Sequence, residues 1–181
     1  MTATLTVPAG TVSVSPASAS TGTTVTVTGS NFPPSTTASV LTFGGASALP
    51  TGGITTDADG GFSVTTEVPA ATTGGSLSPG AAIVSATVGS IAGTTTNFSV
   101  PNPTISISPS SATVEDIITI TGTGFNALTA VTDLNIGTAS ALPSPAPRAD
   151  RTGSVTASVI VPLLNPGKYT VVMTNATGFT A

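Results

Sequence analysis

MTATLTVPAGTVSVSPASASTGTTVTVTGSNF, residues 1–32, matches TTTNFSVPNPTISISPSSATVEDIITITGTGF, residues 94–125, at a constant offset of 93 without a gap. A repeat of this period indicates two successive domains of about 90 residues each. In the second copy TTTNFSV reads as the last strand of one domain, and PNP leads into the next. In the first copy the same segment has no domain before it to complete. We therefore expect residues 1–7 to be a strand without a place in its own domain.

Short alternating segments bounded by Gly and Pro follow this repeat in each half. Such segments favour short β-strands and turns, and no stretch shows a helical period. In the first half the predicted strands lie around Val12, around Val25 and over residues 39–43, 62–68, 82–88 and 94–100. The second half repeats this order. About seven short strands per domain predict an all-β chain of two tandem Greek-key β-sandwiches.

Charge and residue content exclude several classes of function. The 181 residues contain three Lys and Arg, seven Asp and Glu, and no His or Cys. A net charge of −4 provides no basic patch for nucleic acid. Without His or Cys there is no thiol or imidazole for catalysis or metal binding. Ser, Thr or Gly interrupts every apolar stretch, so no membrane insertion is expected. We expect no enzyme activity, no catalytic or metal residue and no cofactor.

Three sequence blocks resemble a known type of domain. The first is Ser15-Pro16, Gly22, residues 25–29 and Phe32, with Ser108-Pro109, residues 118–122 and Phe125 as its second copy; the others are residues 56–68 and 166–175. Together they resemble immunoglobulin-like domains of bacterial and archaeal surface proteins, of the IPT/TIG type. The resemblance implies Ig-like sandwiches and a place in filament, S-layer or adhesin proteins. Glu115-Asp116 replaces the usual Gly-Thr and puts one turn in doubt.

The two ends of the chain complement each other in this scheme. We expect residues 1–9 to be a donor strand and joint, 10–101 the first Ig-like domain, and 102–181 a second domain that lacks its last strand. A sandwich without that strand exposes an apolar groove and an unpaired edge. The donor interface is predicted at Ala3, Leu5 and Val7, which alternate with threonines. The acceptor end is predicted at Val171, Met173 and Phe179.

These features predict an extracellular, cell-surface structural subunit. Donor-strand complementation would join copies head to tail into a pilus-like homopolymer, since heterologous contacts that do not close give fibres. One alternative is an adhesin or S-layer-type repeat fragment, a binding or spacer module cut one strand out of register. Another is a virion decoration protein.

The remaining motifs carry little chemistry. Asp57, Asp59 and Gly60 lack the further ligands of a Ca²⁺ loop and are typical of a turn. Asn97 and Asn175 begin Asn-X-Ser/Thr sequons, so N-glycosylation is predicted as possible at both. Tyr169 occupies the position of a tyrosine corner.

Overall fold

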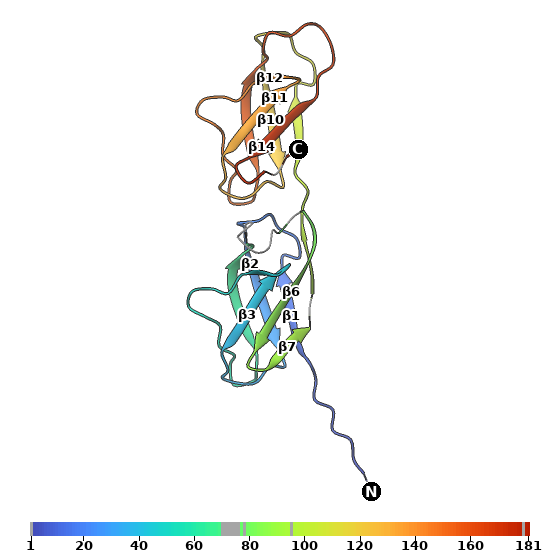
Figure 1. The fold of residues 1–181 in the computed structure, drawn as a ribbon, viewed down its shortest axis with the longest axis vertical. Coiled ribbons are helices and arrows are strands. Elements are labelled where there is room, and N and C mark those ends of the chain that lie inside the picture. Colours follow the sequence, from blue (N-terminus) through green and yellow to red (C-terminus); the bar gives the residue numbers. More distant parts are fainter. Residues whose placement is uncertain (1, 70–76, 78, 95, 179) are drawn as a thin grey trace. The chain divides into compact units, whose positions relative to one another are not determined.

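The computed structural model describes residues 2–69, 77, 79–94, 96–178 and 180–181. Within these residues all regular secondary structure is β-strand. The chain divides into two compact units, Met1–Ser18 with Thr24–Ser99, and Ala19–Thr23 with Val100–Ala181. The predicted all-β class with two tandem sandwiches is confirmed (Figure 1). The domain boundaries that the sequence suggests stay a prediction. Within the described residues no helix is long and apolar enough to cross a bilayer.

The described residues of the first unit form eight strands. They are β1 (Gly10–Ser15), β2 (Thr24–Ser30), β3 (Ala38–Phe43), β4 (Ala46–Ser47), β5 (Phe62–Glu67), β6 (Gly80–Val88), β7 (Ile91–Thr94) and β8 (Thr96–Val100). β1, β2 and β5 form one layer, and β3, β4 and β6 form the other. β7 pairs with a strand of each layer, so the sheet order runs β4-β3-β6-β7-β1-β2-β5.

Six strands are formed by the part of the second unit that the structure describes. They are β9 (Thr104–Ser108), β10 (Ile117–Thr123), β11 (Val131–Ile136), β12 (Ala139–Ser140), β13 (Val155–Ile160) and β14 (Val171–Asn175). The order is β13-β10-β9 in one sheet and β12-β11-β14 in the other. No described strand joins these two sheets as β7 does in the first unit.

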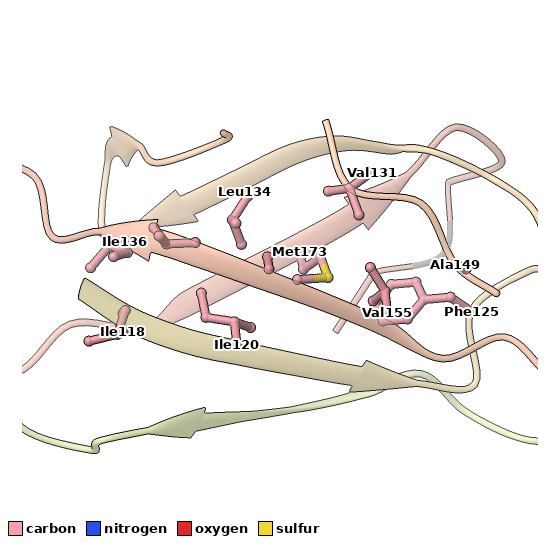
Figure 2. Packing of buried hydrophobic residues seen from close by; sticks show 11 residues of the cluster. Ile118, Ile120, Phe125, Val131, Leu134, Ile136, Ala149, Val155 and Met173 are labelled. Atoms are coloured by element: carbon pink, nitrogen blue, oxygen red, sulfur yellow. The ribbon is translucent and has the colours of Figure 1, made fainter. Parts of the chain in front are cut away.

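The core of each unit comes from the alternation that the sequence shows. Val25 and Val27 of β2 are 2% and 0% exposed, and Ile118 and Ile120 take the corresponding positions in β10. Figure 2 shows Ile118 and Ile120 pointing toward Leu134 and Met173 between the two sheets of the second unit. Burying each such side chain stabilises the fold by roughly 1.5–3 kcal/mol.

The outward face of the β1–β2 pair is covered with hydroxyl groups. Thr11 and Ser30 are hydrogen-bonded across the strands at 2.7 Å, and Ser13 and Thr28 at 2.6 Å. The second unit repeats the pattern at Ser106 and Thr121, 2.6 Å apart. These pairs give the sheets a polar surface without charge, as the low content of charged residues requires.

Candidate strand-acceptor groove

β7 closes the gap between the two layers of the first unit. It pairs antiparallel with β6, where Thr87 lies opposite Ala92. It also pairs in parallel with β1, where Thr11 lies opposite Thr94. β8 continues this course beside β6, and Ser99 N–H donates to the Ala17 carbonyl at 3.0 Å. Residues 91–94 therefore pair with an edge of each layer, and residues 96–100 pair with β6.

The side chains of β8 also seal one side of the core. Phe98 and Val100 are each 1% exposed. The ring of Phe98 meets the ring of Phe43 edge-on, with centroids 5.2 Å apart and planes at 87°. Edge-to-face pairs of this kind add roughly 0.5–1.5 kcal/mol to the burial of their area.

In the second unit the corresponding edge is mostly open. β14 has β11 on one side, and on the other side only Thr180 and Ala181 among the described residues. Thr174 forms a bridge with Thr180, while Met173 and Ala181 exchange backbone hydrogen bonds of 2.9 and 3.0 Å. β9 pairs with β10 alone. Unpaired edges of this kind are sites where a further strand can add.

The core of the second unit is correspondingly less covered. Leu134 lies opposite Met173 as Leu41 lies opposite Ala86, which matches β14 to β6 residue by residue. Val84 and Val68 of the first unit are fully buried. Their counterparts Val171 and Val161 are only half-buried. The difference marks the face of the core that β8 covers in the first unit.

A groove of about 870 Å³ lies along this uncovered face. One wall comes from β9, β10 and residues 109–114, and the other from residues 161–171. The larger aliphatic side chains that line it are Ile107, Val114, Ile118, Ile136, Val161, Leu164 and Val171. A groove with apolar walls and an unpaired strand beside it can bind an extended segment with alternating apolar residues.

Tyr169 forms part of the same wall. Its hydroxyl donates to the Asn165 carbonyl at 2.7 Å, the bond to an upstream backbone group that a tyrosine corner makes. Its ring covers Gly137, where an added Cβ would lie 2.8 Å from the ring. Tyr169 thus fixes the loop that leads into β14 and keeps that wall of the groove in place.

The structure places the predicted acceptor residues differently. Val171 lines the groove, and its role as an acceptor residue stays a prediction. Met173 is 0% exposed and belongs to the core of the unit. Phe179 lies outside the described residues. Sequence reasoning missed Ile136 as a groove residue. The signal was its position in the repeat, since it corresponds to the large apolar residue Phe43, 93 positions earlier.

The predicted donor residues belong to none of the described strands. Residues 2–9 form no strand within the chain, and all eight are exposed. Leu5 and Val7 are 89% and 79% exposed, although they occupy the repeat positions of the buried Phe98 and Val100. The half-buried strand that the alternation predicts therefore needs an edge that this segment does not find within its own chain.

Three acidic side chains accept hydrogen bonds from residues of their own turns. Hydrogen bonds from the backbone N–H and the hydroxyl of Thr113, at the groove, lower the pKa of Asp116. Hydrogen bonds from the Thr152 side chain and the Ser154 backbone lower the pKa of Asp150. Asp57 likewise accepts N–H groups of its own turn, including that of Gly61 at 2.7 Å. In the part of the chain that is described, no three acidic side chains gather as a metal site would require.

The two sequons differ in their surroundings. Asn97 is exposed on β8. Asn175 is 2% exposed, and its Nδ2 donates to the Thr129 hydroxyl at 3.1 Å. Its Oδ1 accepts from the backbone and the hydroxyl of Thr177. Glycosylation at both asparagines stays a prediction, and at Asn175 it would replace the bond to Thr129.

The profile of the family described as "IPT/TIG domain" matches residues 11–100 and again residues 103–181. The chain belongs to the IPT/TIG domain family. This is a family of non-catalytic, immunoglobulin-like domains, so the resemblance seen in the sequence is confirmed. None of the curated proteins matches the sequence.

Among solved structures, this IPT/TIG chain is similar to SGBP-B from a complex xyloglucan utilization locus in Bacteroides uniformis. The identity is 18%, the TM-score is 0.33, and the match covers 96% of this chain and 48% of that one. It is also similar to InvD of Yersinia pseudotuberculosis, with 18% identity, a TM-score of 0.32 and coverage of 98% and 55%. The chain spans about half the length of these proteins.

Proposed function

We propose that this protein is a structural subunit of an extracellular, pilus-like filament. Residues 1–9 of one copy enter the groove of the next and complete its second sandwich by donor-strand complementation. The partner is thus a second copy of the same chain. Because the donor and the groove are different surfaces, the contact is heterologous, and copies joined in this way extend into an open fibre.

One comparison within the molecule carries the proposal. In the first unit, residues 96–100 pair with β6 and bury Phe98 and Val100. In the second unit the same edge borders an apolar groove. Residues 1–7 repeat residues 94–100 with Leu5 and Val7 at the two buried positions. Burying these two side chains would contribute roughly 1.5–3 kcal/mol each.

The first unit cannot take up this segment itself, because β8 already fills its edge. Only Pro8 and Ala9 separate Val7 from the start of β1 at Gly10. Since an extended residue spans about 3.3–3.6 Å, the donor strand of an incoming copy leads almost directly into its first sandwich. The joint between copies would then copy Val100-Pro101-Asn102-Pro103-Thr104 within the chain.

The decisive experiment compares the full chain with a variant that lacks residues 1–8. The full chain should form fibres in electron micrographs and sediment as a polymer. The shortened chain should stay monomeric with an unchanged circular dichroism spectrum, because the removed residues belong to no strand. Fibres of normal length from the shortened chain would refute the proposal.

A matched pair of substitutions separates burial from mere proximity. Leu5→Asp places a carboxylate in the groove and should abolish fibres, since a buried unpaired charge is strongly unfavourable. Thr4→Asp places the same charge on the opposite face of the strand and should leave fibres intact. If the chain of residues 1–181 remains monomeric throughout, the repeat-fragment alternative gains support. The groove would then take a strand from a following domain of a longer polypeptide.

A further inference from the structure

The two units differ at the contact that holds the inserted strand. In the first unit two aromatic rings make this contact, Phe98 from β8 and Phe43 from β3. Both rings are buried, at 1% and 0% exposure. Phe43 lies opposite Val84 in the pairing of β3 with β6. The contact therefore sits where β8 covers the end of the core.

In the second unit Ile136 takes the place of Phe43. It lies opposite Val171 in the pairing of β11 with β14, and both residues line the open groove. The repeat offset of 93 relates Ile136 to Phe43 and Leu5 to Phe98. Leu5 on the donor segment therefore replaces Phe98, and Ile136 in the acceptor groove replaces Phe43.

We infer that Leu5 of one copy packs against Ile136 of the next and that this contact sets the register of the inserted strand. The inference rests on the proposed function and adds the position in the groove that Leu5 of the donor strand occupies. The donor presents small Ala3 on one side of Leu5 and shorter Val7 on the other. A shift by two residues would bring one of these to Ile136 and leave part of the groove unfilled, which is unfavourable in a packed core.

A double-mutant cycle on the full chain tests this contact, with the critical concentration for fibre assembly as the readout. Leu5→Ala and Ile136→Ala should each raise it by about tenfold or more, since each removes a buried aliphatic side chain. Because both substitutions remove the same contact, the critical concentration of the double variant should exceed that of the more affected single variant by no more than about threefold.

Two control pairs define the register. Val7→Ala with Ile136→Ala should give effects that multiply, because Val7 occupies the next seat along the groove. Leu128→Ala, at an exposed position outside the groove, should change nothing alone or combined with Leu5→Ala. Coupling of Ile136 with Val7 or Ala3 in place of Leu5 would overturn the inferred register.

Ile136 is also a core residue, so folding needs its own check. The Ile136 and Leu128 variants are first melted without residues 1–8, and Ile136→Val replaces Ile136→Ala in the cycle if the alanine variant unfolds at the assay temperature. If the Leu5 and Ile136 effects multiply while fibres still require residues 1–8, this inference fails and the proposed function stands. If fibres form without residues 1–8, both this inference and the proposed function are refuted.

Discussion

Glu115 adopts a left-handed backbone conformation, with φ at 69°. Gly22 holds the corresponding position of the first unit, with φ at 78°. A residue with a side chain loses roughly 1–2 kcal/mol in this region, whereas glycine enters it freely. The turn that the sequence put in doubt therefore keeps its shape, because the surrounding strands hold the glutamate in a conformation that suits glycine.

Replacing this residue should relieve the unfavourable backbone conformation. Glu115→Gly should raise the free energy of unfolding of the second unit by about 0.5–1 kcal/mol, after the larger entropy of the unfolded glycine chain is subtracted. Urea titration followed by circular dichroism measures the change. Glu115→Ala is the control. It removes the charge but keeps a side chain in the unfavourable left-handed conformation, so it should leave the free energy of unfolding nearly unchanged. An equal increase in the free energy of unfolding from both variants would show that the Glu115 charge, and not the backbone conformation, is the cause.

The two turn carboxylates should make the stability of the second unit depend on pH in the acidic range. Hydrogen bonds lower the folded-state pKa of Asp116 and Asp150 below the ordinary 3.8. A depressed pKa adds stability above the unfolded value, and this is lost as pH falls through the folded value. Thermal melting should thus show a drop in Tm below about pH 4. In the variant with Asp116→Asn and Asp150→Asn this drop should be smaller, and an identical drop would contradict the assignment.

At the scale of strands, one repeat position has opposite roles in its two copies. Phe98 is buried in β8, whereas Leu5 projects from a segment without partners in its own chain. In the unassembled chain lacking a polymer contact, Phe98→Ala should lower the free energy of unfolding of the first unit by about 3–5 kcal/mol. Leu5→Ala should leave it unchanged. Calorimetry on dilute protein makes the comparison, and a similar loss from both would mean that Leu5 is buried within its own chain.

Most strands could be predicted because their alternation is strong. The residues around Val12, Val25 and Val27 lie in strands as expected, and Pro16 follows the end of β1. β4 and β12 were not predicted, since two residues are too few to show alternation.

The groove was harder to predict than the strands. The sequence indicates an open edge on β14, and Val171 lies there. Alternation alone does not distinguish Met173, which faces the centre of the core, from Val171, which lies at its uncovered end. The wall formed by Ile107, Ile118 and Ile136 depends on how two sheets meet in space, and no local pattern encodes that.

At the scale of the whole molecule, the scarcity of charge should show in the assembly. Residues 1–9 carry no charged side chain, and Lys168 is the one charged residue lining the groove. The critical concentration should therefore change less than about threefold between about 0.05 and 0.5 M sodium chloride. It should fall on warming from the cold, since hydrophobic burial strengthens with temperature there. A steep salt dependence would indicate an electrostatic contact elsewhere.

The parallel pairing of β1 with β7 has a mechanical consequence. Tension applied at Gly10, where β1 begins, and at Val100, where β8 ends, pulls neighbouring parallel strands in opposite directions along their length. The bonds at Thr11 and Thr94 and the bond from Ser99 to Ala17 then carry the load at the same time. A shear geometry of this kind yields only when several bonds fail together, so the first unit is suited to bear a stretching force.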